Sequence, residues 1–480
     1  MLGAKMDQGE SKSFPTELAE VARRLGDFFR SKPVWASRVP ARLDVMGGIA
    51  DYSGANVCEA TLGAGVAVAV QPRTDRLLRI CTSPAGCQGL PVEMCIPLDR
   101  LAPNGRPATY ERVRELFRKN PLASWAAYAA GSLLALMREE SVRPETGLDV
   151  WISSAVPMNA GVASSAAVEI GALCAFDACL GSGLDASRIA QLGQMAENRV
   201  VGAPCGIMDQ IAIASGRRGR LLHILCRPGS VIGPVPIPKG TGFAGIHSGV
   251  RHSVAAAPYG DVRIGAFMGR RILNERRVKA GREPVAHLTE IATAELASHG
   301  RMALPEQMSG ADFLARFKTH GDPATTIRPG AVYRIRGPAR HAIFENERVL
   351  RFIDALRTAA GGDLSGCVAA GKEMEGSHAS YRDECRLSVP EVDWLVEATG
   401  RIGPKRGLYG AKITGGGAGG TVAVYGRVEA LRKELPGLVR EYERQTGLRA
   451  AVFGGTSQGA LEFGTRVFKP VRGGWTCRKA

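Results

Sequence analysis

Long apolar runs are missing from this sequence of 480 residues. No stretch approaches the roughly 18 consecutive apolar residues that indicate a membrane-spanning helix, so we expect no membrane partner. The N-terminal sequence MLGAKMDQGESKSF also lacks the apolar core of a signal peptide. We therefore expect a cytoplasmic protein.

Cysteine pairs of the C-x-x-C type are absent, although the chain has 11 cysteines. This pattern fits neither a disulfide framework nor a tetrahedral zinc site, and it predicts reduced thiols. Lys and Arg exceed Asp and Glu by 62 to 46, a net charge of +16, but no run of five basic residues occurs. Aromatic residues are only 6% and do not alternate with the basic pairs. We expect no nucleic-acid partner; the charge is either a solvated surface or an attraction for an anion such as a nucleotide.

What is present is the composition of a globular protein, with 45% apolar residues and enough length for two or three domains. Short β-prone runs between Trp35 and Pro72 predict a hairpin. Residues 148–156 predict a strand, and residues 121–138 and 164–180 predict helices. A second pattern of strands and helices extends from about Phe243 to Phe468. We expect an α+β architecture of two lobes, divided as a flexible leader at 1–14, a domain at 15–245 and a domain at 246–480.

The predicted strand leads directly into a run of small residues, PMNAGVASSAA at 157–167, and a helix follows. Backbone N–H groups and the positive end of the helix dipole would converge there, which suits a phosphate. Ser164 and Ser165 add hydroxyls for a phosphate oxygen or Mg²⁺. The ending of a Walker loop is absent. On its own, the run is also consistent with a Ser N-cap on a buried helix.

Three further stretches place dense glycine or charge where a ligand can approach. Residues 414–420 read TGGGAGG, which provides either a close backbone approach or a flexible turn. Arg42 and Asp51 lie between apolar runs, as an internal ion pair or as functional groups. Asp209 follows Glu197 by 12 positions, and a carboxylate there could bind metal, accept a proton or cap a helix.

Taken together and in this order, the four stretches resemble the GHMP small-molecule kinase superfamily. Four segments resemble its galactokinase branch: PCGIMDQ at 204–210, SGVRHS at 248–253 with Tyr259 after it, WAAY at 125–128 and SHASYRDE at 377–384. The resemblance implies a two-lobed GHMP kinase fold, with a ribosomal S5 domain 2-like N-terminal lobe and a ferredoxin-like α/β sandwich as C-terminal lobe. It also implies ATP and Mg²⁺ as cofactors and a sugar as substrate.

The resemblance assigns roles to particular residues. Asp209 and Arg42 would lie at the anomeric hydroxyl as catalytic residues, and Ser165 and Glu197 would hold Mg²⁺. The remaining sugar contacts would come from Asp51, Gly206, Tyr259, Gly48 and Ile49, with Cys205 as a wall of the pocket. The ATP phosphates would be held by Pro157, Asn159, Ala160, Gly161, Val162, Ala163, Ser164, Ser165, Ala166, Gly415, Gly416 and Gly417. Trp125 and Tyr128 resemble positions near the nucleotide, or they form a packed helix face.

The chain departs from the galactokinase pattern at one informative place. Galactokinases usually carry GEHTD where this chain reads GGIAD at 47–51, so Gly48 and Ile49 replace two polar residues near the hydroxymethyl group of galactose. L-Arabinopyranose is galactopyranose without that group. An apolar patch there would leave a galactose 6-hydroxyl poorly hydrogen-bonded, at a cost of roughly 1–3 kcal/mol. Ala163 also replaces the first of three serines common in the phosphate loop of the family.

The sequences of residues 44–54 and 246–254 also resemble the kinase domain of L-arabinokinases. Plant members add a glycosyltransferase-like N-terminal region, and we expect none here because the first motif begins at Arg38. The sequence therefore predicts an ATP-dependent sugar 1-kinase that makes L-arabinose 1-phosphate. The alternatives are a galactokinase or kinase of another galacto-configured sugar, and a catalytically silent sugar and ATP sensor. Both a monomer and a homodimer are compatible with the sequence.

Overall fold

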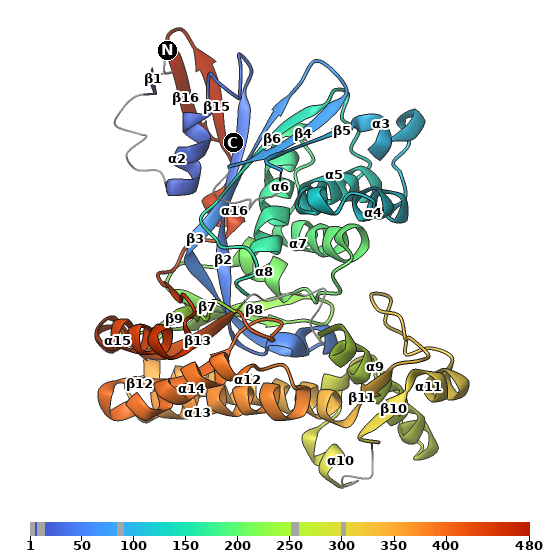
Figure 1. Cartoon of the computed structure of the whole chain (residues 1–480), viewed down its shortest axis with the longest axis vertical. Coiled ribbons are helices and arrows are strands. Elements are labelled where there is room, and N and C mark those ends of the chain that lie inside the picture. Colours follow the sequence, from blue (N-terminus) through green and yellow to red (C-terminus); the bar gives the residue numbers. More distant parts are fainter. Residues whose placement is uncertain (1–4, 7–14, 84–90, 251–258, 299–303) are drawn as a thin grey trace.

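The computed structural model describes residues 5–6, 15–83, 91–250, 259–298 and 304–480. Most of the expected leader at 1–14 and the segment Arg251–Ser253 lie outside the described residues. Two lobes are stacked along the long axis of the molecule (Figure 1). The α+β architecture expected from the sequence is confirmed.

The upper lobe is organised around a long antiparallel hairpin, β2 (Val34–Met46) and β3 (Asn56–Pro72). The sheet has the order β1-β16-β15-β2-β3-β6-β4-β5. In addition, β7 pairs with the first part of β3, and β8 pairs with β7. The remaining strands are β1 (Lys5–Met6), β4 (Leu77–Thr82), β5 (Glu93–Pro97), β6 (Leu148–Ser154), β7 (Arg220–Leu225), β8 (Ser230–Pro236), β15 (Arg466–Val471) and β16 (Gly474–Lys479).

Alternating side chains of β3 supply two different cores, because successive residues of a strand point to opposite faces. Val66, Val68 and Val70 belong to the main core with α5 and α6, whereas Ala67 and Ala69 pack with α2. The helices of this lobe are α2 (Thr16–Arg23), α3 (Leu98–Leu101), α4 (Tyr110–Arg118), α5 (Ala127–Glu139), α6 (Ser164–Leu180), α7 (Ala186–Met195), α8 (Met208–Ser215) and α16 (Ala460–Phe463).

The lower lobe is a four-stranded antiparallel sheet in the order β12-β13-β9-β14, covered by long helices (Figure 1). Its strands are β9 (Thr241–His247), β12 (Leu408–Ile413), β13 (Thr421–Arg427) and β14 (Ala451–Phe453). Its helices are α9 (Tyr259–Lys279), α12 (Arg336–Ala360), α13 (Ser365–Ser380), α14 (Pro390–Ile402) and α15 (Val428–Thr446). A small subdomain beside α9 holds α10 (Thr293–Ser298), β10 (Gln307–Ser309), α11 (Gly310–Phe317) and β11 (Val332–Arg334).

The chain passes between the lobes more than once. The division expected at residue 245 falls inside β9, a strand of the lower sheet. Near the C-terminus, β15 pairs with β2 and β16 pairs with β15, so residues 466–479 belong to the upper sheet. The lobes are therefore not two consecutive segments of the chain.

Two expectations about chemistry and location can be compared with the structure. Among the described residues, the buried cysteines are free thiols: Cys58, Cys81, Cys174, Cys226, Cys367 and Cys385. Within the described part of the chain, no helix combines the length and apolarity that crossing a membrane requires.

Candidate active site

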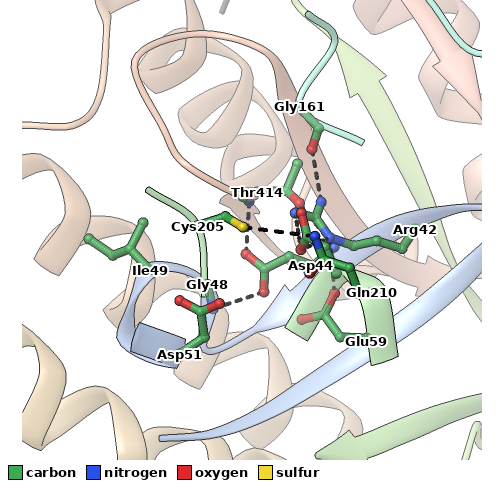
Figure 2. A network of polar contacts seen from close by, with 12 residues as sticks. Arg42, Asp44, Gly48, Ile49, Asp51, Glu59, Gly161, Cys205, Gln210 and Thr414 are labelled. Atoms are coloured by element: carbon green, nitrogen blue, oxygen red, sulfur yellow. Dashed lines mark hydrogen bonds and ion pairs between the residues drawn. The ribbon is translucent and has the colours of Figure 1, made fainter. Parts of the chain in front are cut away.

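Arg42 is the centre of a polar network between the two lobes (Figure 2). It lies on β2, and only 3% of its side chain is exposed. Its Nη2 and Nε lie 2.6 and 2.7 Å from Oδ1 of Asp209, and its Nη1 donates to the carbonyl of Gly161 at 3.0 Å. Burial disfavours the guanidinium charge, but the nearby carboxylates, Asp209 first, raise the pKa of Arg42 above its ordinary value. The alternative of an ion pair between Arg42 and Asp51 is wrong, because the partner is Asp209.

Asp209 is the more accessible member of this pair. It lies in the first turn of α8, and 20% of its side chain is exposed. Both contacts with Arg42 use Oδ1. Its Oδ2 makes no hydrogen bond within the described residues and is free to meet a ligand.

The run of small residues at 157–167 forms a tight turn into α6. Asn159, Gly161 and Ala163 all have positive φ, at 59°, 76° and 57°. Ala163 is the N-cap, and within the described chain no side chain caps the first turn of α6. The alternative of a Ser N-cap is therefore wrong. The first N–H groups of a 17-residue helix are left for another acceptor, which is the arrangement that binds phosphates.

The glycine-rich segment 414–420 packs against this turn, although the two are distant in sequence. Thr421 donates its hydroxyl to the carbonyl of Ala160 at 2.7 Å. A Cβ atom on Gly415 would lie 3.1 Å from the carbonyl oxygen of Gly161. The two loops that the sequence assigns to the phosphates therefore lie side by side.

A second cluster of carboxylates lies beside the start of α6. Ser165 hydrogen-bonds to Glu197, which lies on the helical turn η5 (Ala196–Val201). Gln210 donates to Glu197 at 2.8 Å and to Glu169 at 3.3 Å. Burial, then repulsion from Asp209, raises the pKa of Glu197, and burial raises the pKa of Glu169 well above its usual range.

The polar groups beside the start of α6 have the chemistry of a Mg²⁺ site. No cluster of three or more His, Cys, Asp or Glu side chains suited to a metal occurs among the residues that the structure describes. Ser165, Glu197 and Glu169 nevertheless supply the oxygen atoms that Mg²⁺ prefers, and Mg²⁺ commonly keeps waters and phosphate oxygens as its other ligands. The Oε1 atoms of Glu169 and Gln210 are buried without a hydrogen-bond partner in the described chain. The residues therefore fit the ion.

The expected sugar contacts also come together. A Cβ atom on Gly206 would lie 1.8 Å from Oδ2 of Asp51, so this close approach requires glycine. Burial, then repulsion from Asp209, raises the pKa of Asp51 to about 7. Tyr259, at the start of α9, packs edge-on against Tyr52. Burial raises the pKa of Tyr259 well above its ordinary value, and the nearby Asp51 raises this pKa further.

Arg263 is a buried residue that the sequence did not identify. It binds Asp322 through Nε and Nη2 at 2.7 and 2.8 Å. Its Nη1 donates to the carbonyls of Pro204 and Cys205 at 3.2 and 3.1 Å. Arg263 therefore fixes the backbone that presents Gly206.

The position of Gly48 differs from the expected apolar patch. A Cβ atom there would lie 1.7 Å from Oη of Tyr381, so a hydroxyl fills this space. Ile49 is 1% exposed and belongs to an apolar cluster of the lower lobe. In Figure 2 its side chain lies apart from the polar residues around Arg42. Introducing Glu at Gly48 therefore requires Tyr381 to move.

Further expected residues have clear positions. The thiol of Cys205 hydrogen-bonds to Glu197, and its N–H donates to Asn198 at 2.8 Å. Burial, then Glu197, raises the pKa of Tyr128, which places Tyr128 beside the Glu197 cluster. Nε1 of Trp125 is buried without a partner in the described residues. Tyr128 therefore lies near the phosphate turn, whereas Trp125 packs against the main core of the upper lobe.

Glu59, Asp44 and Lys412 are further buried charged residues that the sequence did not identify. Glu59 is 1% exposed on β3, and its Oε2 lies 3.5 Å from Nε of Arg42. Asp44 and Lys412 form an ion pair at 2.8 Å in which both side chains are fully buried. The signal for Glu59 and Asp44 was a single acid inside an apolar strand, where a charge is usually paired or functional.

Comparisons with known proteins agree with this arrangement. The family model described as GHMP kinases N terminal domain matches residues 127–217. The chain is 36% identical to the L-arabinokinase of Arabidopsis thaliana over 92% of its own length and 47% of that protein, so it spans about half of this relative. It is 30% identical to the galactokinase of Chloroflexus aggregans over 90% of this chain and 94% of that one.

Solved structures show the same fold. The structure of Lactococcus lactis galactokinase complexed with galactose matches with a TM-score of 0.65 at 20% identity, over 92% of this chain and 95% of that one. The mevalonate kinase of Methanococcus jannaschii matches with a TM-score of 0.52 at 16% identity, over 88% of this chain and 98% of that one. The two-lobed fold expected from the sequence is confirmed.

Proposed function

Because this chain belongs to the GHMP kinase family and is a sugar kinase of the galactokinase and L-arabinokinase type, we propose that it phosphorylates L-arabinose at the anomeric hydroxyl. The products are L-arabinose 1-phosphate and ADP. The observation that carries the proposal is the contact of Arg42 with both Asp209 and the phosphate turn. This contact supports a role for Asp209 as a proton acceptor beside the proposed phosphate site.

The reaction needs few covalent roles from the protein. The anomeric oxygen of the sugar attacks the γ-phosphorus of ATP, the bond from that phosphorus to the bridging oxygen breaks, and ADP leaves. Oδ2 of Asp209 accepts or orients the proton of the attacking hydroxyl. Arg42 holds Asp209 through Oδ1 and keeps it beside Gly161, so the nucleophile and the phosphate are aligned.

The phosphates would lie at the start of α6, between the turn at 157–166 and Gly415, Gly416 and Gly417. The uncapped N–H groups of α6 would donate hydrogen bonds to the negatively charged phosphate oxygens. Ser165 and Glu197 would hold Mg²⁺, with Glu169 behind them. When bound, Mg²⁺ would neutralise charge on the phosphate oxygens.

The ring hydroxyls of the sugar would be held by Asp51, Tyr259 and the backbone at Gly206. The preference for a pentose rests on the region of Gly48 and Ile49. Tyr381 fills the space beside Gly48, and Ile49 offers no polar atom from its side chain. A hydroxymethyl group would therefore find no room there. The polar atoms beside Gly48, Oη of Tyr381 and Oδ2 of Asp44, are already bound to backbone groups and to Lys412. The similarity to an L-arabinokinase over 92% of the chain supports the same substrate.

The test is the turnover of a panel of pentoses and hexoses with ATP, followed by release of ADP. We expect kcat/KM for L-arabinose to exceed that for D-galactose by at least about tenfold, because an unpartnered buried hydroxyl costs roughly 1–3 kcal/mol. A preference for galactose would instead support a galactokinase, which the relative from Chloroflexus aggregans favours. Binding of sugar and ATP without turnover of any sugar would indicate a sensor.

Sugar recognition is expected to depend on pH near neutrality. Because burial and Asp209 raise the pKa of Asp51 to about 7, its carboxylate is the main form only above that pH. A neutral carboxyl is a weaker acceptor for sugar hydroxyls, so kcat/KM for the sugar should fall as the pH drops through 7. The profile from pH 5.5 to 8.5, about 1.5 units on either side, would measure this ionisation. A flat profile, or the same step in the Asp51→Asn variant, would contradict the assignment.

The same ionisation has the opposite effect on stability. The folded state binds the proton of Asp51 more tightly than the unfolded state does. The contribution of Asp51 to the free energy of unfolding is therefore complete below its ordinary pKa of 3.8 and is lost as the pH rises through about 7.

A further inference from the structure

Two buried side chains connect the turn that carries Asp51 to the glycine-rich loop. The first is Asp44 on β2. Its Oδ1 accepts a hydrogen bond from the N–H of Gly48 at 3.1 Å, and its Oδ2 accepts one from the N–H of Gly415 at 2.9 Å. One carboxylate therefore holds both segments.

The second side chain is Tyr381, which makes the same connection from the other side. Its hydroxyl accepts a hydrogen bond from the N–H of Ile49 at 2.7 Å and donates one to the carbonyl of Gly415 at 2.9 Å. Both backbone groups of Gly415 are thus held, one by Asp44 and one by Tyr381. We call these two side chains, with Gly48, Ile49 and Gly415, the clasp.

The two side chains of the clasp are buried, and Asp44 is paired with a buried lysine. Asp44 and Tyr381 are fully buried. Nζ of Lys412 lies 2.8 Å from Oδ2 of Asp44 and 5.3 Å from the centre of the Tyr381 ring. Hydrogen bonds to a charged group in such surroundings are strong, and leaving one unmade is costly. Since the Tyr381 hydroxyl occupies the place of a Cβ atom at Gly48, the two segments cannot separate or slide without breaking the clasp.

Each of the two segments that the clasp connects also contributes to a proposed ligand site. Gly48 and Ile49 begin the short helix η1 (Gly48–Ser53), which contains Asp51. On the other side, a Cβ atom on Gly415 would lie 3.1 Å from the carbonyl of Gly161 and 3.3 Å from Nη2 of Arg42. A shift of η1 when a sugar binds therefore moves the loop beside the phosphates.

We propose that Asp44 and Tyr381 are positioning residues that couple sugar binding to nucleotide binding through Gly415. The proposal rests on the sugar and phosphate sites of the proposed function. A bound sugar fixes η1, the clasp fixes Gly415, and the loop is then ordered before the nucleotide arrives. Such coupling is reciprocal, so the nucleotide must tighten sugar binding by the same factor.

The test compares Tyr381→Phe with a matched control, Tyr333→Phe. Tyr333 is also buried, at 1% exposure, and its hydroxyl accepts a hydrogen bond from the N–H of Arg328 at 2.8 Å, in the small subdomain beside α9. Titration calorimetry would measure the Kd of ADP with and without saturating L-arabinose, with a parallel series in D-galactose. We expect sugar to tighten ADP binding at least about fivefold in the native protein and in Tyr333→Phe, and less than about twofold in Tyr381→Phe.

A second variant tests the other side chain of the clasp, and it is made together with Lys412→Met so that no buried charge is left without a partner. Asp44→Asn keeps an acceptor for one N–H but loses the charge that binds Gly415 and Lys412, and it should reduce the coupling in the same way. Thermal unfolding would show that each variant is folded before its titration. A loss of coupling with binary Kd values within about threefold of the native ones separates positioning from general damage.

Unchanged coupling in the folded Tyr381→Phe variant would overturn the proposal, as would a native protein in which sugar and ADP bind independently while the sugar is still phosphorylated. Coupling with D-galactose but not with L-arabinose would keep the clasp and reject the proposed substrate. Binding of neither sugar would overturn the proposed function, and the clasp with it.

Discussion

Asp209→Asn is expected to lower kcat by about 10²- to 10⁴-fold, the usual contribution of a positioned acid or base. The amide has nearly the shape of the carboxylate but cannot accept the proton of the sugar hydroxyl. Because Oδ1 of Asp209 makes both contacts with Arg42, an amide oxygen at that place keeps the geometry. The loss should therefore fall on kcat, with sugar binding changed much less. Release of ADP under saturating L-arabinose measures the effect.

Asp261→Asn is the matched control for this change. Asp261 lies in the first turn of α9, its side chain is 47% exposed, and it pairs with Arg328 on the surface. The same replacement there should leave kcat within about twofold, because surface substitutions have small effects. Near-native turnover by Asp209→Asn would remove Asp209 from its proposed role.

Lys412→Met is expected to lower the free energy of unfolding by about 3–5 kcal/mol, the cost of leaving a buried charge without its partner. Lys412 and Asp44 are both fully buried, and their atoms lie 2.8 Å apart. Met has a similar length and fills the apolar part of the space, so the loss reports the charge rather than a cavity. Denaturant unfolding followed by tryptophan fluorescence and circular dichroism measures this free energy.

Lys405→Met is the control, since Lys405 lies exposed on the short helix η9 (Pro404–Arg406). It should change the free energy of unfolding by less than about 0.5 kcal/mol. The double variant Asp44→Asn with Lys412→Met should lose less stability than Lys412→Met alone, because the unpaired carboxylate is then gone. A single Lys412→Met variant as stable as Lys405→Met would show that the pair is energetically unimportant.

The parts of the fold that depend on local sequence could be predicted. The helix expected at 164–180 coincides with α6, and the strand expected at 148–156 is β6 with its last two residues outside. Both follow from residue composition and from the run of small residues between them. The helix expected at 121–138 begins later, because the 3-10 helix η4 (Pro121–Ala126) precedes α5.

The contacts that assemble the site could not be predicted from local patterns. Tyr381 reaches Ile49 across 332 positions, and Lys412 reaches Asp44 across 368. Tyr381 lies in the SHASYRDE segment that resembles the family, but that segment does not indicate its partners, and Lys412 is a single charge in a strand. The roles of Asp209 and Arg42 came from the resemblance, and the structure supplies the contact between them.

Glu169 shows a different limit. It lies in an apolar stretch of α6, and its full burial beside Glu197 could have been suspected from that setting. Its partner Gln210 comes from another helix, so the cluster exists only in three dimensions. The apolar patch expected at Gly48 is not present for the same reason, because the hydroxyl of Tyr381, which fills this space, is distant in sequence.

The pairing of β15 with the edge of β2 affects the order in which the upper sheet can form. Val34, Trp35 and Ala36 are synthesised before the strands of the lower lobe, whereas their partners Phe468, Val467 and Arg466 are synthesised after them. Until then the edge of β2 has unpaired backbone groups, which are open to pairing with another chain. The upper sheet is therefore complete only after the lower lobe has been synthesised, so the two lobes cannot fold one after the other.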